Sequence, residues 1–297
     1  MTRIIVPLGL LVLLTLSGFK GSKPDHSLLP KTMKDAYVWV PTGELRLEEE
    51  VSQVGGYFLS PMEVTNAEYM AFVQAVRTKG EASELAIVLP DTQQWRSATA
   101  YNEPYVKHYH SHVAYANYPV VNISHEAALR YCAWREEKLN SLAADGLRYR
   151  VRLPSRKEWV RAANGDCQDL SYAWGGPNIR NARGQALCNY RHVGDQSIRA
   201  GKEAGTYEVV EPIGDYMGVA GYLTDNADIT APVHAYWPNA FGLYNMNGNV
   251  AELLAETGLA AGGSWASPGY DVRNESIMLV EGPSPFVGFR TLVEVVR

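Results

Sequence analysis

The pattern of apolar and polar positions predicts two strands and a helix at the start of the folded region. Residues 36–41, AYVWVP, combine aromatic and β-branched side chains as strands do, and residues 55–64, GGYFLSPMEV, are expected to form a second strand. Thr65 and Glu68 then have the spacing of a capping box, which marks the start of a helix. Four apolar residues fall on one face of that helix: Tyr69, Phe72, Val73 and Val76. We expect this face to pack against the core.

Two further capped helices are predicted in the middle of the chain. The run YPVVNISHEAALRYCAWREEKL indicates a short strand, a cap at Ser124 and a helix. Three residues of this helix share one side: Ala127, Tyr131 and Trp134. The run RLPSRKEWVRAANG indicates a turn, a second capping box from Ser155 and Glu158, and a helix that ends at Gly165.

The remaining segments predict long loops and a return to strands near the C-terminus. Residues 80–117 and 166–240 are expected to be mostly irregular, whereas residues 260–265 and 288–296 are strand-like. There is no internal repeat and no low-complexity tract. We therefore predict a single α+β domain over residues 36–297. Loops of this length normally need additional fixing in a compact fold, and bound calcium is one way to supply it.

The N-terminus has the pattern of a secretory signal. Arg3 precedes the apolar run IIVPLGLLVLLTLSG, which ends in small residues and is short for a membrane-spanning helix. An uncleaved anchor is the alternative. The following residues resemble a lipoprotein box, but Phe19 occupies the position of the lipid-bearing cysteine, so lipidation is not expected. We predict a signal peptide over residues 1–19, a polar linker over residues 20–35, and export to the periplasm or outer envelope.

Composition narrows the choice of partners and of covalent cross-links. The 297 residues carry a formal net charge of −5 and no basic stripe, so nucleic acid is not expected as a partner. The three cysteines are Cys132, Cys167 and Cys188, and their spacing fits no zinc pattern. Cys132 lies on a predicted helix face and is expected to pack in the core. A disulfide between Cys167 and Cys188 is an open alternative in an oxidising compartment.

The ordered set of segments resembles the formylglycine-generating-enzyme (sulfatase-modifying factor) family. The matching segments are YVWVPTGEL, MEVTNAEYMAFV, YPVVNISHEAALRYCAW, RLPSRKEWVRAANG, YAWGG, APVHAYWPNAFGLYNMNGNVAEL, GGSW and GFR. Together they extend over roughly residues 36–297. The resemblance implies a C-type-lectin-related α+β fold with little regular secondary structure, which agrees with the loop-rich pattern.

The resemblance also implies two structural calcium sites. The ligands of the first would be Asn189, Tyr190, Asp225 and Ala227. The ligands of the second would be Asn245, Gly248, Val250 and Glu252. Calcium accepts six to eight carboxylate, amide and backbone oxygens, and a glycine lets neighbouring carbonyls converge. The alternatives are a turn role for Asp225 and, for Glu252, a place at the solvated start of a helix.

The positions that the family uses for catalysis differ here. The family oxidises a sulfatase cysteine with oxygen and a copper ion held by two cysteines that follow the GGS strand. In this chain those positions are Ser267 and Val272, and Ser264 lies just before them. Copper(I) selects sulfur ligands, and no cysteine follows Cys188. Ala251 also replaces an aromatic residue that is typical of the family, as does Leu253. Formylglycine generation and copper binding are therefore not expected.

Two other features bear on function. His108, His110 and His112 would share one face of a strand and could meet one metal ion; the alternative is a surface stretch packed by its rings. The segment from LPDTQQW to YPVV resembles an insertion in the gliding-motility and type IX secretion lipoproteins of Bacteroidota, which have this fold without the cysteine pair. That likeness implies a non-catalytic role.

We therefore predict an exported scaffold or binding protein with protein partners in the cell envelope. A divergent metal-dependent oxidoreductase and a lectin-like binder of a glycan are the alternatives. If the chain is a scaffold, side chains such as Trp265 or Tyr270 should fill the space above Ser264 and Ser267. If it is an enzyme, three clustered ligands should surround an open cavity there.

Overall fold

The fold is that of a computed structural model, which describes most of the chain after its first 28 residues. The described residues are 29–97, 100–144, 146–191, 198–203, 205–209, 227 and 229–296. The predicted signal peptide, residues 1–19, lies outside them. Within these ranges no helix is long and apolar enough to cross a membrane.

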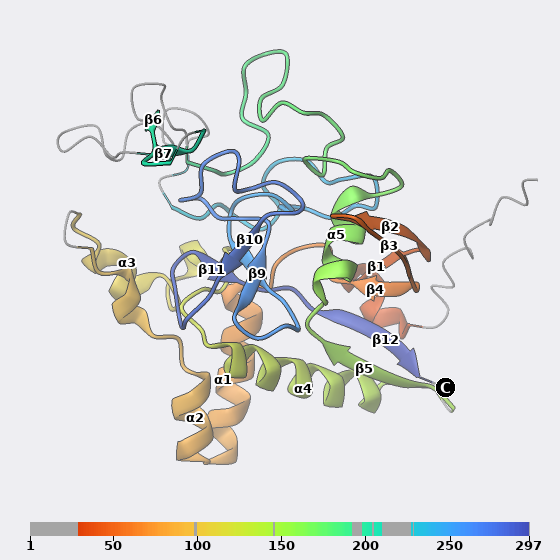
Figure 1. Cartoon of the computed structure of the whole chain (residues 1–297). Helices are drawn as coiled ribbons and strands as arrows, with labels where there is room; N and C mark the ends of the chain where they lie inside the picture. The colour runs from red at the N-terminus through yellow and green to blue at the C-terminus, as the bar shows by residue number, and fades with distance from the viewer. Residues whose placement is uncertain are drawn as a thin grey trace, which may run out of the picture.

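A four-stranded antiparallel sheet joins the two ends of the folded region. Its order is β1 (Val38–Val40), β4 (Tyr57–Leu59), β12 (Leu292–Val296) and β5 (Arg148–Arg152). The last strand of the chain therefore occupies an inner position between β4 and β5 (Figure 1).

A second sheet carries the residues that matter for the site. Its order is β10 (Ile277–Leu279), β9 (Leu259–Ala261), β8 (Ala251–Leu253) and β11 (Val287–Gly288), with β8 and β11 parallel. Two separate hairpins complete the strands. They are formed by β2 (Gly43–Leu47) with β3 (Glu50–Val54), and by β6 (Ile198–Ala200) with β7 (Tyr207–Val209).

The helices lie around these sheets (Figure 1). The α-helices are α1 (Asn66–Lys79), α2 (Ala82–Val88), α3 (Glu103–His108), α4 (His125–Ser141) and α5 (Arg156–Asn164). Short 3-10 helices are η2 (Lys31–Ala36), η3 (Thr92–Trp95) and η4 (Val113–Tyr115). In Figure 1, α4 runs along β5, and α1 pairs with α2 at the bottom of the view.

An aromatic cluster forms the centre of the main core. Tyr69 of α1 stacks on Tyr131 of α4 at 5.8 Å between ring centroids, and Phe289 meets Tyr131 edge-on at 5.4 Å. Phe72 is buried in the same cluster. The apolar faces predicted for the first two helices therefore meet each other and the C-terminal segment.

Most of the predicted elements are present. Both N-terminal strands form, and Thr65 and Ser155 each complete a capping box while Ser124 caps α4. The described parts of residues 166–240 are loop apart from the β6–β7 hairpin.

Three predictions are corrected. Residues 80–117 are not mostly irregular, because α2, η3, α3 and η4 lie there. The short strand expected before Ser124 is absent: Pro119 makes only an isolated bridge to Thr65. All three cysteines are free, so Cys167 and Cys188 form no disulfide.

The described end of the segment predicted as a linker packs against the folded body. Leu29 and Met33 are both buried in the main core beside α4, and residues 31–36 form η2. The part before residue 29 lies outside the described residues. The hairpin β2–β3 was not foreseen from the sequence.

Candidate functional site

A buried turn, residues 245–249, forms the polar centre of the molecule. Asn245 and Asn249 have positive φ angles of 49° and 63°, and Gly248 has φ 74°. A side chain at Gly248 would place its Cβ 2.2 Å from the Asn189 carbonyl oxygen, so only glycine fits. The turn leads directly into β8.

Glu252 on β8 is part of a buried ion pair. Its carboxylate accepts hydrogen bonds from Arg290 Nε and Nη2, both at 2.5 Å, and from Trp159 Nε1 at 2.7 Å. Arg290 and Glu252 are almost completely excluded from solvent. Arg290 also donates to the carbonyl oxygens of Ser60 and Tyr244. The alternative that placed Glu252 at the solvated start of a helix is wrong, because it is a buried strand residue.

A second buried carboxylate, Glu63, lies under the same turn. Its two oxygens accept hydrogen bonds from the side-chain amides of Asn249, at 2.8 Å, and Asn245, at 3.2 Å. Burial raises the pKa of Glu63 to about 7; Arg290 lowers this pKa and Glu252 raises it. Sequence reasoning missed Glu63, because a single glutamate after a strand carries no distinctive signal.

Two of the four predicted ligands of the second calcium site, Glu252 and Asn245, already have side-chain partners. The charge of Glu252 is balanced by Arg290, and the amide of Asn245 is bonded to Glu63. A calcium ion here would have to compete with a buried guanidinium group for the same carboxylate. The Glu252 carboxylate consequently does not fit the role of a calcium ligand in this arrangement.

Three residues of the first predicted calcium site lie within the described residues: Asn189, Tyr190 and Ala227. Asn189 donates from Nδ2 to the Ile229 carbonyl oxygen at 2.8 Å, which brings residues 189–190 beside the segment that contains Ala227. Tyr190 is buried and Ala227 half-buried. Asp225, the only carboxylate of this set, lies outside the described residues.

The positions expected to be catalytic in the family are packed into the structure. Ser267 accepts a hydrogen bond at Oγ from the Ser264 N–H at 3.0 Å, and the two hydroxyl oxygens lie 3.2 Å apart. Both serines are buried. Val272 is fully buried in an apolar cluster with Cys188, Tyr190 and Tyr172. The serine hydroxyls thus close a local turn, and the valine fills a core.

Trp265 and Tyr270, the side chains expected above these serines, differ in how far they are buried. Trp265 is half-buried, packs against Phe286 and donates from Nε1 to the Pro285 carbonyl oxygen at 3.1 Å. Tyr270 is 68% exposed and its ring lies 3.5 Å from the guanidinium carbon of Arg273. Tyr270 therefore does not fill the space above Ser264 and Ser267.

The three histidines do not lie on a strand, which corrects that expectation. His108 ends α3, His112 caps η4, and Nδ1 of His110 lies 3.1 Å from the Asn66 amide oxygen. Burial lowers the pKa of His110 to about 4, so its imidazole is neutral at pH 7. Among the described residues no three His, Cys, Asp or Glu side chains gather closely enough to hold a metal ion.

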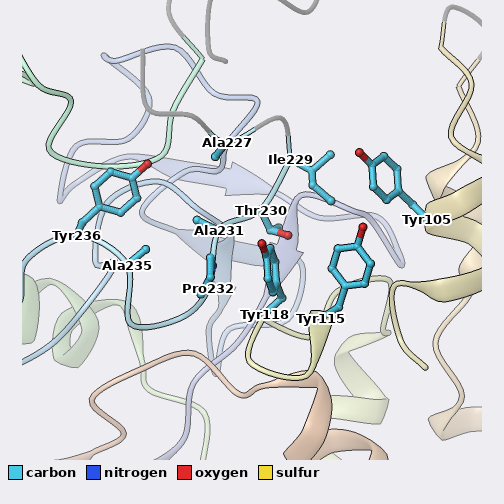
Figure 2. Close-up of a pocket in the computed structure, with 10 residues that line it drawn as sticks. All are labelled: Tyr105, Tyr115, Tyr118, Ala227, Ile229, Thr230, Ala231, Pro232, Ala235 and Tyr236. Carbon is cyan, nitrogen blue, oxygen red and sulfur yellow. The ribbon is translucent and has the colours of Figure 1, made fainter. Parts of the chain in front are cut away.

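A cavity of about 440 Å³ is lined by residues from two parts of the chain (Figure 2). It lies between the α3–η4 segment and the segment that contains Ala227 and residues 229–236. Its lining is mostly tyrosine and small residues: Tyr105, Tyr115, Tyr118, Ala227, Ile229, Thr230, Ala231, Pro232, Ala235 and Tyr236. Its volume is within the usual range of small-molecule sites. The cavity was not predicted from the sequence, in which Ala227 was expected only as a ligand of the first calcium site.

The chain matches the profile of the sulfatase-modifying factor enzyme 1-like domain over residues 23–295. A formylglycine-generating enzyme of Thermomonospora curvata is 34% identical over 140 residues, which cover 47% of this chain and 34% of that protein. The inactive C-alpha-formylglycine-generating enzyme 2 of Mus musculus is 31% identical over 148 residues, or 48% of this chain and 34% of that protein. The chain thus spans about a third of the length of both relatives.

A solved structure agrees with this match at the level of the fold. PvdO from Pseudomonas aeruginosa superposes with a TM-score of 0.53 at 18% identity, covering 87% of this chain and 94% of that one. Fold and site together define a loop-rich domain of mixed helices and strands around a buried polar turn. The chain belongs to the sulfatase-modifying factor enzyme 1-like domain family, so the family predicted from the sequence is confirmed.

Proposed function

We propose that this chain is a non-catalytic, exported scaffold or binding protein of the cell envelope. The observation that carries the non-catalytic part is the chemistry at the two positions where the family resemblance calls for copper-binding thiols. Ser267 directs its hydroxyl into the turn with Ser264, and Val272 is buried among apolar side chains. Neither residue can supply a thiolate to copper(I).

The names of the relatives agree with this proposal without deciding it. One relative is named as a formylglycine-generating enzyme and another as an inactive one. The domain family therefore includes both kinds of protein. Function has to be argued from the site rather than from the fold, and in this chain the site lacks the thiols.

The proposed setting is the gliding or type IX secretion machinery, with envelope proteins as partners. This part rests on the signal-like residues 1–19 and on the resemblance of the tyrosine- and histidine-rich insertion to that of the envelope lipoproteins. The C-type-lectin relation of the fold, which the family resemblance implies, belongs to the same proposal. A domain of that kind would use a rigid frame to present loops for binding.

A structural calcium ion at the first predicted site is part of the proposal. Asn189, Tyr190, Asp225 and Ala227 would hold it, and the ion would tie the long loop to the frame. The bond from Asn189 to Ile229 supports this placement. Such an ion would have no part in chemistry; it would only fix the loop.

A copper-loading and oxidation assay tests the non-catalytic role. The full chain is mixed with copper(I), oxygen and a cysteine peptide of a sulfatase, and conversion to formylglycine is followed by mass spectrometry. We expect no conversion above a no-protein control, while the Thermomonospora curvata relative run in parallel converts the peptide. Stoichiometric copper uptake together with peptide oxidation would overturn the proposal and favour a divergent oxidoreductase.

A second experiment tests the setting. The protein is purified from its native envelope under mild detergent, its N-terminus is sequenced, and co-purifying proteins are identified. We expect a cleaved signal near residue 19 and secretion or motility components in the preparation. An uncleaved chain in the cytoplasmic fraction would contradict export.

A further inference from the structure

The cavity of about 440 Å³ has walls from two distant parts of the chain (Figure 2). Tyr105 of α3, Tyr115 of η4 and Tyr118 just after it stand on one side. Tyr236 stands on the opposite side, with small residues of the 227–235 loop between them. All four tyrosines are half-buried, so each presents part of its ring to solvent while the rest is anchored.

Hydrogen bonds hold the two walls in fixed relation. The Tyr109 hydroxyl lies 2.8 Å from the Thr230 hydroxyl and donates to the Pro119 carbonyl oxygen at 2.7 Å. The Val233 N–H donates to the Asn117 carbonyl oxygen at 2.9 Å, again joining insertion to loop. The cavity is therefore formed before any ligand arrives, which lowers the entropic cost of binding.

The loop wall is also fixed to the buried turn. Asn249 accepts at Oδ1 from the Ala231 N–H at 2.7 Å and donates from Nδ2 to Glu63. The insertion is fixed to α1, because the Asn66 amide donates to the carbonyl oxygens of Tyr109 and Tyr115 at 3.0 Å each. Asn249 and Asn66 thus hold the two walls of this cavity in position.

The lining selects a class of ligand by its chemistry. None of its ten residues carries a charge at pH 7, so an ionic ligand would find no counter-charge among them. Four phenols and the Thr230 hydroxyl can each donate and accept hydrogen bonds. Tyrosine rings offer flat apolar faces together with a polar edge. Stacked C–H faces and many neutral hydroxyl groups are the features of a pyranose ring.

We infer that this tyrosine-lined cavity binds a neutral oligosaccharide. The inference rests on the proposed function, because it gives a non-catalytic binding protein its ligand. Tyr105 and Tyr236 act as the stacking residues on opposite walls, and Thr230 lies between them next to Tyr118.

Isothermal titration calorimetry of the full chain with a panel of neutral hexasaccharides tests the inference. The panel contains cello-, malto-, manno- and chito-hexaose, each titrated up to millimolar concentration. We expect at least one of them to bind. Tyr105→Ala and Tyr236→Ala should each weaken that binding about tenfold or more, because a truncated aromatic anchor loses its stacking surface. Tyr236→Phe keeps the ring and should weaken it less.

Two control variants match these changes outside the cavity. Tyr101 lies in the same insertion and is 81% exposed, and Tyr270 is 68% exposed on another loop. Tyr101→Ala and Tyr270→Ala should leave the affinity unchanged. Ala235→Trp adds a large side chain that fills the cavity, so it should abolish binding. This variant tests the inference independently if a tyrosine variant does not fold. Melting temperatures identify any variant that does not fold.

Failure of this inference is distinct from failure of the proposed function. Absence of binding to every neutral sugar would overturn the inference, as would binding that survives Ala235→Trp. Selective binding of a peptide or of an anionic glycan in the cavity would also overturn it. In all of these cases the absence of copper-dependent oxidation would still support the non-catalytic role.

Discussion

At Arg290 a guanidinium group is fully buried beside two carboxylates, Glu252 and Glu63. Arg290→Met should lower the free energy of unfolding by about 3–5 kcal/mol, because it leaves Glu252 as a buried carboxylate without its partner. Urea denaturation measures the loss. The matched control is Arg96→Met: Arg96 forms a solvent-exposed pair with Glu103, which contributes little. Equal losses of stability in the two variants would contradict the conclusion that burial makes the Arg290–Glu252 pair important for stability.

Glu63 makes the stability of the protein depend on pH. Because its pKa in the folded protein is raised to about 7, the folded chain holds a proton that the unfolded chain releases above about pH 4.5. Stability should therefore fall as the pH rises between these values, by about 3 kcal/mol from this group. Unfolding free energies measured across that range should show the slope.

Glu63→Gln should remove most of this slope, because the amide cannot ionise. The control Glu137→Gln replaces an exposed carboxylate on α4 and should keep the wild-type slope. A slope that persists in the first variant would show that another group is responsible.

Some residues of the candidate site could be predicted from the sequence, and others could not. Gly248 could be assigned to a turn because a glycine among asparagines predicts a positive φ angle. The partners of Glu252 and Glu63 could not be foreseen, because their contacts join distant parts of the chain: Asn249 and Glu63 are 186 positions apart. No local pattern encodes such a pairing.

At the scale of elements, helix caps were the most predictable features. Ser155 and Glu158 form the capping box of α5, and the Glu158 carboxylate also accepts hydrogen bonds from Arg152 at 2.6 and 2.8 Å. Ser155→Ala should lower the free energy of unfolding by about 1 kcal/mol, because α5 loses its cap. Ser141→Ala, at the exposed end of α4, is the control and should change it much less. Thermal unfolding followed by circular dichroism measures both.

Short elements escaped prediction for a physical reason. Helices α2 and α3 have seven and six residues, too few for a clear apolar stripe, and their stability comes from tertiary contacts. All four strands of the second sheet have three residues or fewer, which is below the length at which alternation can be recognised. Longer helices such as α1 and α4 have both an N-terminal cap and an apolar stripe, so they could be predicted.

For the whole molecule, calcium removal tests the proposed structural ion. If the first predicted site holds calcium, chelation with EGTA should lower the melting temperature, and added calcium should restore it. An ion present at 100 times its Kd would contribute about 2.7 kcal/mol. Magnesium, which prefers stricter octahedral geometry, is the control and should not replace it. A melting temperature that EGTA leaves unchanged would rule out this ion.

The cavity could not be predicted from single residues or single elements, because it forms only when distant parts of the chain come together. Tyr109 and Thr230, which join its walls, are 121 positions apart, and each wall alone looks like an ordinary polar loop. The tyrosine content of the insertion was visible in the sequence. Its convergence with residues 227–236 depends on how the insertion docks on α1 and on how the loop docks on the buried turn.

The inner place of β12 has a consequence for biosynthesis. Because β12 joins β4 to β5, this sheet must stay incomplete until residues 292–296 have left the ribosome. A product truncated before residue 292 would have two unsatisfied strand edges, which would make it a substrate for proteases and a seed for aggregation.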